Sequence, residues 1–189
     1  FILIEMSDRW MLGYFRGIND VGLYGAGYKI GSIVLLTVNS FNLNWQPYYL
    51  KTGVQNGLSS FKNIGEHFIL IILLVSTVLS MVWPLIFRCH LGSYYVIGEA
   101  FWEGGHVIPV LCAGYVCYGV FVLQMPSIFL KTKQKWAPFF WGTGFIVNFC
   151  SNCILIPWFG MYGAAYATLC AYCTMAIMLI YKNHTWLPI

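Results

Sequence analysis

The sequence predicts an all-α fold, a polytopic bundle of transmembrane helices. Hydrophobic residues make up 59% of the 189 residues and charged residues only 8%, whereas soluble domains carry about a quarter charged residues. So few charges cannot cover the surface of a water-soluble globule of this size. The charges also cluster between long apolar runs, so we expect a lipid bilayer to surround most of the surface.

The apolar runs divide residues 1–189 into the spans of a single transmembrane bundle. Each complete run has about 20 residues or more, which at about 1.5 Å per residue crosses a hydrocarbon core of about 30 Å. The runs are continuous and lack the alternating pattern of barrel strands, which favours helices. We predict one partial span and five complete ones, at about 1–15 (partial), 21–49, 67–87, 107–130, 137–157 and 161–181.

The first segment is interrupted by Glu5, Asp8 and Arg9. Glu5 and Arg9 are four residues apart, so a helix places them on one face. Ionisable groups inside a membrane usually face a cavity or a partner. Three interpretations stay open: a polar cluster that lines a translocation path, a neutralised pair that holds two helices together, or a helix end that lies nearer the membrane surface than the apolar run suggests.

The second segment carries Lys29 and a group of hydrogen-bonding side chains. On a helical wheel of about 100° per residue, the four uncharged members of this group fall within a sector of about 80°. Lipid-facing positions should be apolar, so this sector is expected to face water or protein. We favour a hydrated cavity over amides that only join helices, and the four residues are Ser32, Asn39, Asn42 and Gln46.

The third and fourth spans are joined by a stretch, 94–105, that is aromatic and mixed in charge. This composition suits a short interfacial segment with its aromatic rings at headgroup depth. His106 with Glu99 and Glu103 is the one cluster here that resembles an acid–base group. No nucleophile is placed with it, so we do not expect an enzyme.

The last two spans carry a second amide pair and a group of small residues. Asn148 and Asn152 lie four residues apart on one face of the span 137–157. Like the amides of the second segment, they could line a hydrated cavity or join helices. Small residues begin the final helix and are expected to permit close helix packing: Gly160, Gly163, Ala164, Ala165 and Ala167.

Four cysteines in these two spans fit a common zinc-site spacing. Cys150 and Cys153 form one pair, Cys170 and Cys173 form the other, and sixteen residues separate the pairs. Both pairs lie inside apolar spans, where cysteine is an ordinary small hydrophobic residue. We therefore predict no metal site and no cofactor.

The lysines predict the orientation. If each run crosses once, the linkers at about 50–66 and 131–136 and the tail from Lys182 share one side, and together they hold six lysines. By the positive-inside rule this side is cytoplasmic, which also places the C-terminus there. No contiguous basic stripe of the kind that binds nucleic acid is present. The chain begins at Phe1 inside an apolar stretch and without a signal peptide, so we expect further sequence upstream.

Four stretches of sequence together resemble one family of transporters. They are Ser7 to Phe15 (SDRWMLGYF), Val21–Tyr24 with Tyr28–Ile30, Asn44–Tyr49 (NWQPYY), and the blocks Asn148–Pro157 and Tyr162–Thr168 (YGAAYAT). In this order, they resemble the C-terminal half of the oligosaccharide flippases. This family is the polysaccharide transport branch of a superfamily that also contains multidrug antiporters and the lipid II flippase.

The resemblance implies twelve helices in two six-helix bundles, of which this chain supplies helices seven to twelve. It implies a lipid-linked oligosaccharide on a polyprenyl pyrophosphate carrier as substrate, moved across the inner (cytoplasmic) membrane by alternating access. The N-terminal half of the same transporter and membrane lipids are the implied partners. Family cavities tend to be cationic, so Arg9 and Lys29 are the implied pyrophosphate contacts, although Glu5 and Asp8 lie beside Arg9.

Other functions stay open at this point. A drug or cation antiporter of the same superfamily should have a tighter acidic site and a smaller aromatic pocket. A membrane-embedded sugar polymerase or glycosyltransferase should have a larger outer loop, rich in arginines and carboxylates, than the short stretch at 94–105. A non-transporting assembly subunit is disfavoured by the charges inside the spans. The sugar unit, the coupling ion and the oligomeric state do not follow from the sequence.

Overall fold

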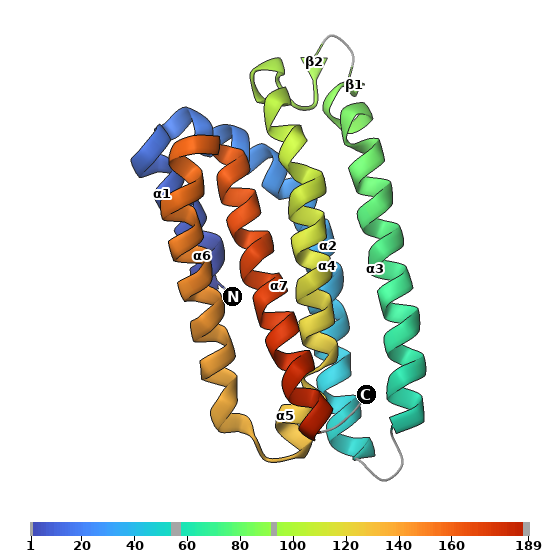
Figure 1. The fold of residues 1–189 in the computed structure, drawn as a ribbon. Coiled ribbons are helices and arrows are strands. Elements are labelled where there is room, and N and C mark those ends of the chain that lie inside the picture. Colours follow the sequence, from blue (N-terminus) through green and yellow to red (C-terminus); the bar gives the residue numbers. More distant parts are fainter. Residues whose placement is uncertain (1, 54–57, 92–93, 187–189) are drawn as a thin grey trace.

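The computed structural model describes residues 2–53, 58–91 and 94–186, so Phe1 of the first predicted span lies outside them. The predicted fold class is confirmed: the chain is an all-α helical bundle (Figure 1). The elements in chain order are α1 (Ile2–Arg16), α2 (Ile18–Thr52), α3 (Leu58–Phe87), the two-residue strands β1 (His90–Leu91) and β2 (Tyr94–Tyr95), the 3₁₀ helix η1 (Glu99–Val107), α4 (Ile108–Leu123), α5 (Pro126–Leu130), the 3₁₀ helix η2 (Gln134–Trp136), α6 (Ala137–Phe159) and α7 (Met161–Trp186).

Five helical stretches of the described chain are long and apolar enough to cross a membrane. They correspond to the five complete spans predicted from the sequence: Ile18–Thr52, Ser60–Phe87, Glu99–Leu130, Gln134–Phe159 and Met161–Trp186. The helix α1 has 15 residues, or about 22 Å at 1.5 Å per residue, and corresponds to the partial span. The chain therefore has the structure of a multi-pass membrane protein.

The helices alternate in direction, as expected if each predicted span crosses the membrane once. Figure 1 shows the C-terminal end of α2, the beginning of α3, α5 and the C-terminal end of α7 at one end of the bundle. The α1–α2 turn, the β1–β2 hairpin and the α6–α7 turn lie at the other end. We call these the lysine end and the hairpin end.

Single glycines make the two sharp turns at the hairpin end. Gly17 joins α1 to α2 with φ of 94°, and Gly160 joins α6 to α7 with φ of 56°. A side chain at either position would strain the backbone, because positive φ is a region that L-residues with a Cβ rarely adopt.

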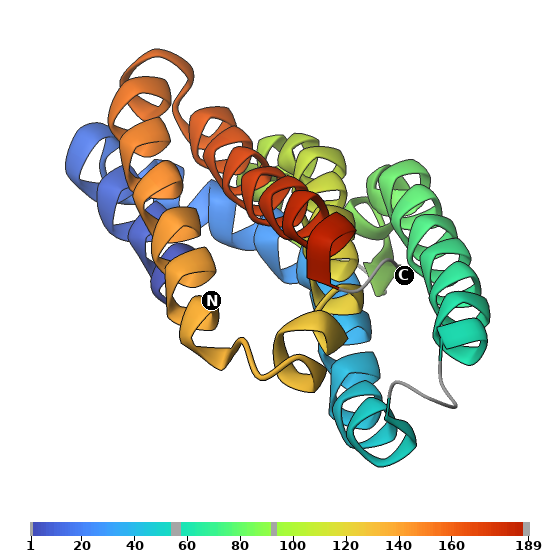
Figure 2. The same ribbon diagram turned by 60° about the horizontal axis from the view of Figure 1, so that its bottom comes forward.

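The helix α7 occupies the centre of the bundle. It packs between α6 and α4, while α2 packs on α4 and α1 packs on α6 and α2 (Figure 2). Ala164, Ala165, Ala167 and Ala171 of α7 are all fully buried, so small side chains allow its neighbours to approach closely. This agrees with the packing role predicted for Ala164, Ala165 and Ala167, whereas Gly160 lies in the turn before α7 and not in the helix.

The predicted spans at 67–87 and 107–130 differ most from the observed helices. The helix α3 begins nine residues before the apolar run, because exposed polar residues such as Lys62 and Glu66 continue the helix beyond its apolar part. The predicted span at 107–130 is divided, since α4 ends at Leu123 and α5 begins at Pro126. Proline lacks the N–H that would continue the hydrogen-bond ladder, so it starts a new helix here.

Candidate functional site

The carboxylate of Asp8 is the centre of a buried hydrogen-bonded cluster. Asp8 is fully buried, and its Oδ1 accepts hydrogen bonds from Asn148 Nδ2 at 2.8 Å and Asn152 Nδ2 at 2.7 Å. Its Oδ2 accepts from Tyr24 OH at 3.2 Å and from Thr168 Oγ1. These donors come from α2, α6 and α7, so one side chain of α1 joins it to three other helices.

Glu5 lies one turn earlier on α1 and has tyrosine partners. Tyr172 OH donates to Glu5 Oε1 at 2.7 Å, and Tyr115 OH donates to Oε2 at 3.2 Å. Tyr28 also interacts with this carboxylate. Glu5 is therefore held by hydroxyl donors from α2, α4 and α7. Hydrogen bonds to a buried carboxylate offset part of the free energy that its removal from water costs.

The partners of Asp8 and of Glu5 are supplied by pairs of residues that lie four apart on the same helix. A helix repeats every 3.6 residues, so side chains four apart share a face. Tyr24 and Tyr28 on α2, and Thr168 and Tyr172 on α7, each contribute one partner to Asp8 and one to Glu5. On α6 the corresponding spacing is that of the predicted amide pair, Asn148 and Asn152, whose side chains also bond each other at 3.1 Å.

The structure brings four of the predicted residues together: Glu5, Asp8, Asn148 and Asn152 lie in one buried region of the bundle. Sequence reasoning missed their tyrosine and threonine partners. The available signal was the spacing of four between hydroxyl-bearing residues on two spans.

Arg9 does not form an ion pair with the carboxylates within the described residues. Its guanidinium carbon lies 4.3 Å from the ring centroid of Tyr28, and its Nε is buried without a hydrogen-bond partner there. Arg9 lines a cavity of about 400 Å³ between α1 and α2, together with Trp10 and Val21. It therefore connects the buried cluster to the surface of the bundle.

The predicted polar sector of α2 does not join the Asp8 cluster. Ser32, Asn39 and Asn42 are half-buried, and Gln46 and Lys29 are exposed. The buried face of α2 is instead formed by other residues, which pack toward the rest of the bundle: Tyr24, Gly27, Gly31, Val34, Leu35, Val38, Trp45 and Tyr49. We call Ser32, Asn39, Asn42 and Gln46, with Lys29, the polar flank of α2.

The amides of this polar flank have no hydrogen-bond partner among the described residues. Among the described residues, the side chains of Asn39, Asn42 and Gln46 make no hydrogen bond, while Ser32 Oγ bonds the carbonyl of Lys29 at 2.9 Å. An amide without a partner is costly in hydrocarbon. The polar flank of α2 thus has the chemistry of a surface that contacts water or another polar surface.

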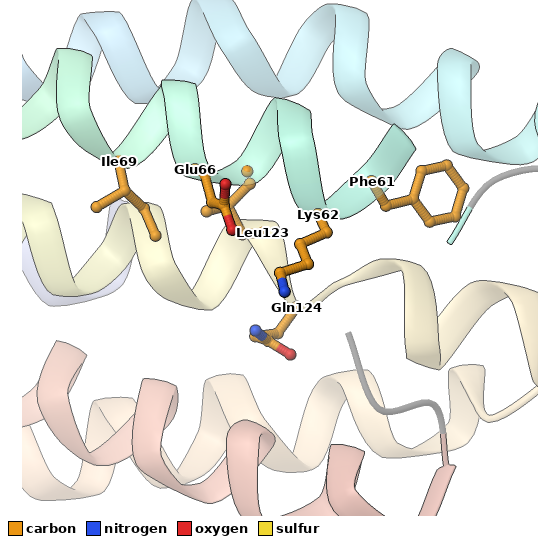
Figure 3. Close-up of a pocket in the computed structure, with 7 residues that line it drawn as sticks. Phe61, Lys62, Glu66, Ile69, Leu123 and Gln124 are labelled. Atoms are coloured by element: carbon orange, nitrogen blue, oxygen red, sulfur yellow. The ribbon is translucent and has the colours of Figure 1, made fainter. Parts of the chain in front are cut away.

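The cavities do not unite the predicted path residues. Lys29 lines a cavity of about 520 Å³ between α2 and the stretch Val96–Phe101, whereas Arg9 lines the α1–α2 cavity. A third cavity, of about 230 Å³, lies at the lysine end, where Lys62 and Glu66 of α3 face Leu123 and Gln124 of α4 (Figure 3). Its lining includes no member of the Asp8 cluster.

The cysteines of the two CxxC pairs do not gather at one point. Cys150, Cys153 and Cys170 are exposed on α6 and α7, and Cys173 faces inward. Its Sγ lies 3.1 Å from that of Cys117 on α4. Within the described residues there is no group of three or more histidine, cysteine or acidic side chains that could hold a metal ion.

In the Asp8 cluster, the side-chain nitrogens of Asn148 and Asn152 point toward Asp8. The cluster therefore stabilises a carboxylate.

The close pair of thiols leads to a first prediction. A lipid-permeable oxidant such as iodine is expected to join Cys117 to Cys173, because the two sulfur atoms are already in contact. Mass spectrometry of the digested protein should detect the linked peptides. Cys117→Ser should abolish that product, and Cys153→Ser, at an exposed position, should not. Equal linkage of Cys173 to several other cysteines would contradict the observed packing of α4 on α7.

No family model, curated protein or solved structure matches the chain. The resemblance to the oligosaccharide flippases therefore remains an expectation from the quoted motifs.

Proposed function

We propose that the chain is the C-terminal six-helix bundle of a flippase that carries a polyprenyl-pyrophosphate-linked oligosaccharide across the cytoplasmic membrane, for the synthesis of a surface polysaccharide. The observation that carries the proposal is the polar flank of α2. Asn39, Asn42 and Gln46 lie on a membrane-spanning helix without partners in the described chain.

Exposing such groups to lipid is energetically costly. Each unsatisfied amide in hydrocarbon costs several kcal/mol, so lipid is an unfavourable environment for three of them and a lysine on one helix. A second bundle opposite α2, with water between the two, would satisfy them. Such a wet passage between two bundles offers hydrogen bonds to the hydroxyl groups of an oligosaccharide.

In this mechanism the polyprenyl tail stays in the bilayer while the headgroup crosses along the polar flank of α2. This route keeps the pyrophosphate and sugar hydroxyls out of hydrocarbon. Arg9 and Lys29 supply positive charge on the α1 and α2 side of the passage, where a pyrophosphate needs it. Transport follows from rocking of the two bundles, which opens the passage to each side in turn.

The buried hydrogen bonds of Asp8 and Glu5 would allow the bundle to move as one rigid body. Asp8 and Glu5 tie α1 to α2, α4, α6 and α7 through buried hydrogen bonds. Helices joined in this way move together, as rigid-body rocking requires. We propose that the lysine end is cytoplasmic, since the positive-inside rule places lysine-rich linkers there.

One observation favours a second candidate. Glu5 and Asp8 form a compact acidic site surrounded by tyrosines, which is what a drug or cation antiporter of the same superfamily should contain. Such a protein would move small cations and leave lipid-linked sugars in place. The two candidates therefore differ in the molecule that crosses the membrane.

A flipping assay in vesicles tests the proposal. The complete transporter is compared with Arg9→Ala and Lys29→Ala, and each variant is expected to lower the rate by about tenfold, the loss of one charge-assisted contact. Lys131→Ala, at an exposed linker position, is the matched control and should keep the wild-type rate.

The outcomes separate the candidates. Unchanged rates in both variants would remove the cationic contacts from the mechanism. Efflux of a cationic dye, without any flipping of lipid-linked oligosaccharide, would instead support the antiporter.

A further inference from the structure

A separate cavity lies at the hairpin end, where α3 meets η1. It has a volume of about 330 Å³ and is lined by Trp83 of α3, by Arg88 directly after that helix, and by Trp102, Glu103 and His106 of η1. This volume lies within the range of about 300–1,000 Å³ that small-molecule sites occupy. Its lining combines aromatic rings with both signs of charge.

The aromatic side chains of this cavity are held in place. Trp102 Nε1 donates to the carbonyl of Ile97 at 3.1 Å, and the ring of Tyr95 lies edge-on to it at 5.2 Å between centroids. On the α3 side, the ring of Trp83 lies 4.8 Å from that of His106. The cavity is therefore preformed.

The two opposite charges of the cavity are not paired with each other. Arg88 places its guanidinium carbon 5.6 Å from the ring centroid of Trp102. No salt bridge or side-chain hydrogen bond of Arg88 or Glu103 occurs among the described residues. A cavity with an unpaired cation and an unpaired anion complements a ligand that carries both charges.

An apolar stripe on α3 leads to this cavity. Leu70, Leu74, Val78, Met81 and Leu85 recur at steps of three and four residues, so they share one helix face, and each is at least half exposed. Arg88 follows at the next step of three. Acyl chains packed along this stripe would bring their headgroup to Arg88, at the polar boundary of the membrane.

We propose that this cavity binds the headgroup of a zwitterionic aminophospholipid of the phosphatidylethanolamine class, with its acyl chains on the α3 stripe. The phosphate lies at Arg88 and His106, and the ammonium group lies at Glu103. Arginine suits a phosphate through paired N–H donors, and a carboxylate accepts charge-assisted hydrogen bonds from an ammonium ion. A purely anionic lipid would place negative charge beside Glu103, which argues against it.

Native mass spectrometry of the purified protein tests this site. The protein is exchanged into nanodiscs of equal parts phosphatidylethanolamine and phosphatidylglycerol, released, and its retained lipid is counted. Wild-type protein should retain phosphatidylethanolamine preferentially. Arg88→Gln and Glu103→Gln should each lower that retention by about tenfold, through loss of one charge-assisted contact.

Two controls preserve the charge changes but move them to the lysine end. Lys131→Gln and Glu66→Gln alter exposed residues there and should leave the retained lipid unchanged. The unfolding temperature of each variant checks that the fold is intact. If a variant at Arg88 or Glu103 does not fold, the preference of the wild-type protein between the two lipids still decides the question.

Three results would overturn the inference. Equal retention of both lipids by the wild-type protein would indicate ordinary annular lipid. A gain of phosphatidylglycerol in Glu103→Gln with unchanged phosphatidylethanolamine would indicate a site for anions alone. Displacement of the lipid by millimolar water-soluble glycerophosphoethanolamine would show that the α3 stripe contributes nothing and that the ligand is not a lipid.

Discussion

Replacing Asp8 with alanine is expected to destabilise the bundle by about 3 kcal/mol or more, because it breaks a buried hydrogen-bond network. The substitution leaves buried donors on Tyr24, Asn148, Asn152 and Thr168 without their acceptor. Each such donor costs about 1–3 kcal/mol when it cannot pair. Relief of the buried charge offsets only part of this loss. The measurement is the unfolding temperature of the purified protein in detergent.

The isosteric variant Asp8→Asn separates shape from charge. It keeps one acceptor oxygen for the surrounding donors, so we expect a smaller loss than in Asp8→Ala, of about 1–3 kcal/mol. Glu66→Ala, at an exposed position on α3, is the control and should change little. If Asp8→Ala unfolds at the wild-type temperature, the cluster does not hold the helices together.

The second large effect is expected where η1 crosses α2. A Cβ added to Gly104 would overlap the carbonyl of Leu23, and one added to Gly27 would overlap the carbonyl of Gly104 and lie 2.7 Å from Val107 Cγ2. Backbone cannot move aside as a flexible side chain can. Gly27→Ala and Gly104→Ala should therefore each destabilise the protein by about 1–3 kcal/mol or more, the cost of overpacking.

Gly25→Ala on the same helix is the matched control. A Cβ at Gly25 meets no atom within 4 Å, so this variant should be neutral or stabilise α2 by up to about 1 kcal/mol through helix propensity. Thermal unfolding of the three variants side by side gives the comparison. Equal effects at positions 25 and 27 would mean that α2 and η1 do not pack as closely as described.

The helices were predictable because the bilayer imposes a length and a composition. The runs at 137–157 and 161–181 correspond to α6 and α7, which begin at the predicted residues and extend a few residues beyond the predicted ends. The predicted boundaries were wrong where polar residues continue a helix beyond its apolar part, as in α3 before residue 67. Hydropathy reports the part of a helix in lipid, and hydrogen bonding decides where the helix itself ends.

The candidate site was predictable only in part. Glu5, Asp8 and the amides of α6 are conspicuous because polar groups are rare in spans. Tyr115 and Tyr172 are not conspicuous, since tyrosine is counted among the hydrophobic residues. Its hydroxyl group can be recognised as a hydrogen-bond donor to a carboxylate only when the position of that carboxylate is known. That the Asp8 cluster and the polar flank of α2 are separate features depends on the rotation of α2, which tertiary packing sets.

The proposed passage requires that the polar flank of α2 faces water. Asn39→Cys and Gln46→Cys in the complete transporter, reconstituted in vesicles, are treated with a membrane-impermeant thiol reagent, and labelling is located by mass spectrometry. Leu74→Cys on the apolar stripe of α3 and the native Cys150, exposed on α6, are the lipid-facing controls. Because the reagent reacts only in water, the account predicts labelling at positions 39 and 46 at least about tenfold faster than at both controls. Labelling at positions 39 and 46 as slow as at position 74 would contradict a wet passage along α2.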